Sequence, residues 1–149
     1  MPSPPVDSLT PIVQNGAPMK VVFAVLADSA NISQEGKLNI LGTFRHIGAT
    51  KFPARHPEMQ LVVRMEASPA EAGMEKQLEV KVLDQDGQQF GSYQGSFTVP
   101  KPKRSGDPAH MQLIMRLIDT VFPRAGRYVF HILIDGRTEH DVPLDVGGS

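Results

Sequence analysis

From residue 20 onward, apolar and polar residues alternate in short runs along much of the chain. In residues 128–134 every second residue is large and apolar, and in residues 78–82 the apolar positions alternate with Glu79 and Lys81. A repeat of two residues is typical of a β-strand with one buried face. Turn-forming residues separate such runs at regular intervals, which predicts an all-β protein, an immunoglobulin-like antiparallel β-sandwich of seven or eight strands. The other predicted strands lie within residues 20–26, 37–44, 59–66 and 89–99.

Residues 109–122 fit two different periodicities. A strand would place Met111, Leu113 and Met115 on one face, but the apolar residues of this segment also fit one side of a helix. The Asp-Pro pair that precedes the segment could cap such a helix. A strand is favoured, because it leads into the proline-glycine corner of residues 122–128 as the connections of a sandwich require.

The last two strands are predicted to form a hairpin at Asp135-Gly136, a dipeptide typical of tight turns. A two-residue loop would set carboxylates opposite the apolar face of the first strand. A three-residue loop over residues 134–136 avoids this conflict, so the sequence predicts that loop. It places Tyr128 opposite Val142, Phe130 opposite His140 and Ile132 opposite Thr138, with His131 on the other face beside Glu139 or Asp141.

The first 18 residues differ in composition from the rest of the chain. They contain Pro2, Pro4, Pro5, Pro11 and Pro18 among small and polar residues, a composition that resists regular structure. We expect an extended or disordered tail over residues 1–18, one β-sandwich domain over residues 19–146 and a flexible C-terminus over residues 147–149. The sequence has neither a secretory signal pattern nor an apolar run of the roughly 20 residues that cross a bilayer. A cytoplasmic location without membrane contact is therefore expected.

The composition excludes several kinds of chemistry. Cysteine is absent, which rules out disulfides, cysteine zinc sites and cysteine nucleophiles. Fifteen basic and sixteen acidic residues nearly cancel, which argues against nucleic acid as a partner. The five histidines lack the spacing of a zinc site, and no serine lies in a nucleophile motif. We therefore expect no catalytic residue, metal or cofactor, and a protein that is not an enzyme.

Two polar motifs suggest ion binding, but each has a plainer interpretation. Asp84-Gln85-Asp86-Gly87 resembles the start of a calcium-binding loop. The later ligands of such a loop are missing, so an ordinary hairpin turn is favoured. Lys101-Pro102-Lys103-Arg104 gathers three positive charges that could receive an anionic partner. It lacks the glycine-rich backbone donors of a phosphate site, so a solvated loop is favoured.

The strand at residues 20–26 is apolar on both faces, whereas a sheet exposed to water on one side would carry polar residues there. The second faces of the strands at 109–122 and 128–134 are also apolar. If these strands are neighbours, their outward residues form a patch that monomers rarely expose. We expect a protein-interaction or assembly module, most simply a homodimer, unless the N-terminal tail or the loops at 49–58 or 67–75 cover the patch. The predicted interface residues are Val22, Ala24, Leu26, Ile114, Ile118, Val129 and Leu133.

A second interpretation is a small-ligand or carbohydrate-binding module. Rigid sandwiches commonly carry their binding residues on loops at one end of the fold. The longer predicted loops contain polar side chains suited to this role, namely Asp28, Asn31, Arg55 and His56.

Three separated motifs resemble those of an uncharacterised bacterial family of small β-sandwich proteins of unknown function. They are Ala24-Val25-Leu26-Ala27-Asp28, the segment from Gly36 to Thr43, and Phe122-Pro123 through Gly126-Arg127-Tyr128 to Asp135-Gly136. The resemblance spans roughly residues 19–145. It implies a bacterial β-sandwich, and it supplies neither an activity nor site residues.

Overall fold

The structure is a computed structural model, and it describes residues 19–148. The tail predicted for residues 1–18 lies outside the described residues, as does residue 149 of the predicted flexible C-terminus. The described chain forms nine strands and one short 3-10 turn, η1 (Pro69–Glu71). The strands are β1 (Lys20–Ile32), β2 (Leu38–Phe44), β3 (His46–Gly48), β4 (Ala54–Ala67), β5 (Glu75–Leu83), β6 (Gln89–Thr98), β7 (Ala109–Phe122), β8 (Gly126–Ile134) and β9 (Arg137–Gly147).

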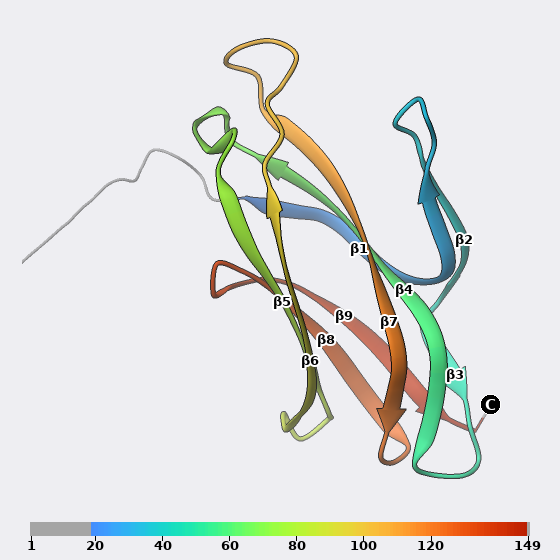
Figure 1. Cartoon of the computed structure of the whole chain (residues 1–149). Helices are drawn as coiled ribbons and strands as arrows, with labels where there is room; N and C mark the ends of the chain where they lie inside the picture. Colours follow the sequence, from blue (N-terminus) through green and yellow to red (C-terminus); the bar gives the residue numbers. More distant parts are fainter. Residues whose placement is uncertain (1–18, 149) are drawn as a thin grey trace, which may run out of the picture.

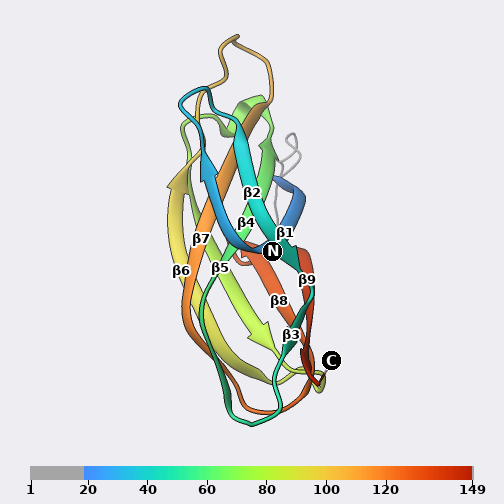
Figure 2. The ribbon, with the colours of Figure 1, turned by 90° about the vertical axis from the view of Figure 1, so that its right-hand side faces the viewer.

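The strands form two sheets that pack face to face (Figure 1). One sheet has four strands in the order β2-β1-β4-β7, and the other has five in the order β3-β9-β8-β5-β6. All neighbours are antiparallel except β3 and β9, which pair in parallel. Figure 2 shows the strands running along the long axis of the molecule. The predicted all-β sandwich is confirmed, and the short β3 brings the number of strands above the predicted seven or eight.

The core lies between the sheets. Leu61, Val63 and Met65 of β4 face Phe130 and Ile132 of β8 in one cluster of buried side chains. Burying a large apolar side chain contributes about 1.5–3 kcal/mol relative to leaving it in water. This cluster is therefore what holds the two sheets together. At one end of the core, three rings pack edge to face with centroids 5.0–6.1 Å apart, those of Phe90, Phe122 and Tyr128.

Residues 109–122 form a strand, and the helical alternative is wrong. The mixed periodicity has a local cause at Asp119, whose φ of 54° is unusual for a residue other than glycine. Before this residue the odd-numbered side chains face the core, ending with Leu117, whereas beyond it Thr120 and Phe122 are buried. The kink exchanges the two faces of the strand, which a count of alternating residues cannot anticipate.

The β8–β9 hairpin has a different register from the predicted one. Its turn has two residues, Asp135 and Gly136, with φ values of 51° and 79°, both positive as in a type I′ turn. A bulge then shifts the register by one residue at Glu139, so that Tyr128 and Phe130 of β8 lie opposite apolar residues of β9. Tyr128 lies opposite Leu144, Phe130 opposite Val142 and Ile132 opposite His140. The predicted three-residue loop is therefore wrong. The extra residue that brings the apolar side chains onto the same face lies in β9 and not in the loop.

Strand β9 continues to Gly147, which pairs with Gly48 of β3. The strand therefore ends one residue beyond the predicted boundary at residue 146. At the other end of the domain, Met19 is buried in the core directly before β1 begins.

Candidate functional site

The predicted interface residues do not share one surface. Ala24 and Leu26 of β1 pack in the core, so their assignment to an outward face is wrong. The cause is a bulge at Val22. Val21 lies opposite Met65 and Phe23 opposite Arg64, so the alternation of β1 shifts by one residue and Val22 itself stays 51% exposed.

The other predicted interface residues lie on opposite sides of the sandwich. Ile114 and Ile118 lie on the outer face of the four-stranded sheet, since the neighbouring residues of β7 face the core. Val129 and Leu133 lie on the outer face of the five-stranded sheet, opposite in parity to the buried Tyr128 and Phe130. A single patch that contains all of them is therefore ruled out.

An apolar row crosses the outer face of the four-stranded sheet. It consists of Val25, Val62 and Ile114, which are direct cross-strand neighbours on β1, β4 and β7. Val62 is fully buried in the middle of the row, and its two neighbours are partly exposed. Beside the row, Arg116 Nε lies 3.1 Å from Glu58 Oε2, and hydrogen bonding to this guanidinium holds the pKa of Glu58 below its ordinary value. The apolar row thus borders on a charged pair.

Strand β7 has only one neighbour, β4, in the described structure. Its core-facing residues Met111, Leu113 and Met115 are only partly buried, although their cross-strand partners on β4 are almost fully buried. Ile114 on the outer face is partly buried as well. Between residues 111 and 115 both faces of β7 are therefore half covered, and the outer backbone edge is unpaired in the described part of the chain.

The other edge strands carry features that discourage pairing with a further strand. β3 is only three residues long. β2 bends at Gly42, whose φ is 74°. β6 contains Gly91 and Gly95, and its pairing with β5 includes a bulge. By contrast, residues 109–118 of β7 pair with β4 in one unbroken register. We call this free edge, together with Ile114 and Ile118 on its outer face, the β7 surface.

The predicted ligand residues are brought together only in part. Asp28 and His56 line one open depression of about 380 Å³ with Phe44 and His46. The ring centroids of Phe44 and His56 are 5.9 Å apart. The two remaining residues have other partners: Asn31 accepts a hydrogen bond from Asn39 at 2.9 Å, and Arg55 pairs with Asp119 at 2.6 Å.

His46 also lines this depression, although its place in the sequence does not mark it as a ligand residue. It comes close to Asp28 because the chain leaves the four-stranded sheet after Phe44 and joins the other sheet at His46. Nothing in the spacing of His46 and Asp28 along the chain signals this, since strand order brings them together.

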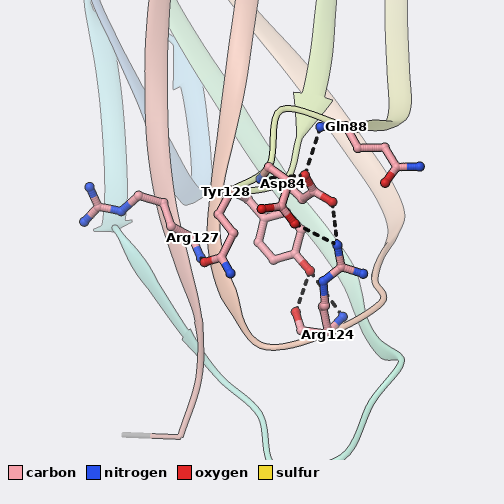
Figure 3. A network of polar contacts seen from close by, with 7 residues as sticks. Asp84, Gln88, Arg124, Arg127 and Tyr128 are labelled. Carbon is pink, nitrogen blue, oxygen red and sulfur yellow. Dashed lines mark hydrogen bonds and ion pairs between the residues drawn. The ribbon is translucent and has the colours of Figure 1, made fainter.

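The calcium-like motif is a hairpin turn tied to the neighbouring corner (Figure 3). Oδ1 of Asp84 accepts hydrogen bonds from the backbone N–H groups of Asp86 and Gln88, both at 2.9 Å, and Oδ2 lies 2.7 Å from Arg124 Nη2. Tyr128 Oη donates to the carbonyl oxygen of Arg124 at 2.5 Å, the arrangement of a tyrosine corner in immunoglobulin-like domains. The Asp84 carboxylate thus has an arginine and two amides as partners, which suits a structural turn.

No group of three histidine or acidic side chains in residues 19–148 is placed to hold a metal ion. The same residues contain no helix with the length and apolar character that a membrane crossing requires.

One histidine has the hydrogen-bonding order of a catalytic triad. His131 Nδ1 lies 2.5 Å from Asp141 Oδ1, and His131 Nε2 lies 2.8 Å from Thr138 Oγ1. Of the two predicted partners of His131, the structure selects Asp141. Acyl transfer also needs hydrogen-bond donors aimed at an oxyanion. Here the three residues lie on paired strands, whose backbone groups serve the sheet, so the arrangement fits a cross-strand polar cluster.

Solved structures similar to this chain include two from species of Pseudomonas. An alkylpurine DNA glycosylase of Pseudomonas fluorescens, solved with DNA containing an abasic-site analogue, aligns with a TM-score of 0.51 and 14% identity over 89% of this chain and 31% of the glycosylase. An immunoglobulin-like protein of Pseudomonas aeruginosa aligns with a TM-score of 0.44 and 15% identity over 89% of this chain and 99% of that protein. The chain spans less than a third of the glycosylase, and a likeness at 14% identity shows the fold alone.

No curated protein sequence matches the chain. A family model does match residues 22–147, from the bulge in β1 to the end of β9. The match covers the whole sandwich, and the family's description names no activity. The chain therefore belongs to DUF6941, a family of unknown function, as the resemblance in its sequence implied.

Proposed function

We propose that the protein is a non-enzymatic interaction module that binds another protein through the β7 surface. The observation that carries this proposal is the partial burial of Met111, Leu113 and Met115, although they face the core side of their sheet. A strand with an unpaired edge and apolar side chains on both faces is suited to accept a further strand.

The surroundings of the β7 surface also suit a protein partner. Protein interfaces typically have an apolar centre and a polar rim. Here Ile114 continues the apolar row of Val25 and Val62, and the Arg116–Glu58 pair lies beside it. The five-stranded sheet presents a more polar outer face, which carries the His131–Asp141 pair and Lys81.

A photo-crosslinking amino acid placed at residue 114 tests this proposal in cells of the source organism. The expected result is a discrete crosslinked protein band. The matched control places the same amino acid at Lys81, on the outer face of the other sheet, and should give no such band. Absence of a band at residue 114, or equal crosslinking at both positions, would contradict the proposal.

A small-ligand module is the second candidate, and the depression lined by Asp28 and His56 supports it. A carboxylate acceptor beside the rings of Phe44 and His56 is a suitable arrangement for a sugar or another polyol. A thermal-shift screen with sugars tests this candidate. A stabilising sugar should lose its effect in Asp28→Asn and keep it in Asn31→Ala, because Asn31 pairs with Asn39 instead.

A further inference from the structure

The unpaired edge of β7 carries backbone donors and acceptors that can pair with an antiparallel strand of the same sequence. In a regular strand, the backbone groups alternate in direction, so part of the N–H and C=O groups of residues 109–118 are directed away from β4. An antiparallel copy of the same strand presents the same groups in reverse order. A two-fold axis through one residue pair can therefore satisfy both edges at once.

We infer that the partner of the β7 surface is a second copy of this chain, with β7 paired antiparallel to β7 and Ile114 opposite Ile114 of the second copy. This inference rests on the proposed function, because it names the partner of the same surface. The two four-stranded sheets then join into one continuous sheet across the axis.

Side-chain pairing selects this register. Residues opposite one another in a sheet must face the same side, so only registers that match odd with odd and even with even positions are allowed. With the axis at Ile114, the outer face pairs isoleucine with isoleucine, and Gln112 with Arg116 on either side. This register sets no like charges directly opposite one another, which would be destabilising.

Neighbouring registers pair the same residues less well. An axis at Leu113 sets Ile114 opposite Gln112, and an axis at Met115 sets Ile114 opposite Arg116. An axis at Arg116 places two guanidinium groups opposite each other. The register centred on Ile114 avoids each of these conflicts.

Gln112 is a polar side chain that lacks a partner within the described part of one copy and lies opposite Arg116 in this register. Its side-chain oxygen Oε1 is buried and has no hydrogen-bond partner among the described residues. Buried polar atoms without a partner are uncommon in folded proteins. In the inferred pair, Arg116 of the second copy comes to the same face of the sheet directly opposite Gln112. The chain's own atoms cover this oxygen, so it meets that guanidinium only when the Gln112 side chain turns toward the edge of β7. The five N–H donors of a guanidinium are then enough to serve both Glu58 and this oxygen.

The core-facing side of β7 also pairs apolar residues in this register. Across the same axis Leu113 lies opposite Met115 and Met111 opposite Leu117 of the second copy. Met111, Leu113 and Met115 are the core-facing residues that remain partly exposed in one copy. The apolar row likewise continues across the axis. It runs from Val25, Val62 and Ile114 of one copy to the same three residues of the second copy in reverse order. The contact closes on itself, so it predicts a dimer and not a filament.

The absence of cysteine from the chain makes a direct test possible, because one introduced cysteine reports one position. Ile114→Cys should form a disulfide-linked dimer under mild oxidation, since each cysteine faces its own copy across the axis. Ile118→Cys is the matched control on the same face of β7, because it faces His110 of the second copy. Leu41→Cys, at a residue that is 72% exposed on β2, measures linkage by random collision. Both controls should give little dimer.

Sedimentation of the full chain at micromolar concentration should show a dimer. Ile114→Lys should raise the dissociation constant at least about tenfold, because it places two positive charges opposite each other. Circular dichroism and thermal unfolding establish whether Ile114→Lys folds. The cysteine experiment tests the register independently of this variant.

A wild-type chain that remains monomeric, with no disulfide at residue 114, would overturn the inference. So would a dimer linked as well through residue 41 as through residue 114. If the purified chain is monomeric while the photo-crosslinker at residue 114 captures a different protein in cells, the interaction module stands and the second copy as its partner does not.

Discussion

Lys76 Nζ lies 2.9 Å from Glu71 Oε2, and both side chains are almost fully buried, with exposed fractions of 10% and 11%. Asp135 Oδ2 lies 3.5 Å from the same ammonium group. The three residues join the start of β5, the 3-10 turn η1 and the turn between β8 and β9. Glu71 is itself held by Ser68, whose backbone N–H donates to Glu71 Oε1 at 3.1 Å. This network fixes one end of the sandwich.

Replacing one member of this network should destabilise the fold strongly. Lys76→Met leaves Glu71 buried without its counter-charge, and breaking a buried pair in this way costs about 3–5 kcal/mol. Urea unfolding measures the loss. The double variant Lys76→Met with Glu71→Gln removes both charges and should recover a large part of it. A double variant no more stable than Lys76→Met would show that packing, and not charge, is responsible.

The Lys76 interaction should be insensitive to pH across the neutral range. Burial alone would lower the pKa of Lys76, but the hydrogen bonds and charges of Glu71 and Asp135 raise it above its ordinary value of 10.5. A raised lysine pKa contributes stability that is fully present below 10.5 and is lost as the pH rises through the folded-state value. The stability difference between wild type and Lys76→Met should therefore be the same at pH 7 and pH 9.

The ionised form of Glu139 should destabilise the fold, so protonation of Glu139 in mild acid should stabilise it. Burial at the β9 bulge raises its pKa above the ordinary value of 4.5, and nearby Arg137 offsets only part of this. The folded protein therefore binds this proton more tightly than the unfolded chain, so the ionised form is destabilising above the folded-state pKa. Glu139→Gln should raise the melting temperature at pH 7, and this gain should disappear below pH 4.5. A gain that is equal at both pH values would contradict the assigned cause.

Tyr128→Phe should destabilise the domain without changing its core packing. The ring remains against Phe90 and Phe122, but the carbonyl oxygen of Arg124 loses its donor and the Arg124 N–H loses its acceptor. Leaving such partly buried groups without partners costs about 1–2 kcal/mol. Equilibrium unfolding in urea tests this. Arg124→Ala keeps the backbone hydrogen bonds and removes only the ion pairs with Asp84 and Asp86, so it should cost less.

The sequence predicts strands well where alternation is regular, as in residues 78–82 and 128–134. It fails at single inserted or twisted residues, because one such residue exchanges the two faces of everything beyond it. The bulge at Val22 moved Leu26 from the expected outer face to the core, and the kink at Asp119 ended the alternation of β7. The hairpin register failed for the same reason, at Glu139.

The candidate sites depend on strand order, which periodicity does not contain. The apolar outer face of residues 109–122 was visible in the sequence, but the position of β7 at the end of its sheet was not. That position explains why residues on both faces of β7 are half-buried. Equally, Asp28 and His56 could be chosen by residue type, while His46 joins them only through the crossing of the chain between sheets.

The depression beside Asp28 yields a prediction about how firmly that carboxylate is held. Gly42 has a φ of 74°, and a Cβ added there would lie 2.6 Å from Asp28 Oδ2. Gly36 is a matched control, with a φ of 83° and open space around it. An alanine in this backbone region costs roughly 1–2 kcal/mol, so Gly36→Ala measures the backbone cost alone. If Asp28 is free to turn its carboxylate away, only its Cβ stays close, at 3.3 Å from the added carbon, and Gly42→Ala should lose little more stability than Gly36→Ala in urea unfolding. We expect this result because Asp28 is exposed. A distinctly larger loss in Gly42→Ala, removed by the additional change Asp28→Ala, would show instead that the carboxylate is fixed over Gly42 as a built part of the depression.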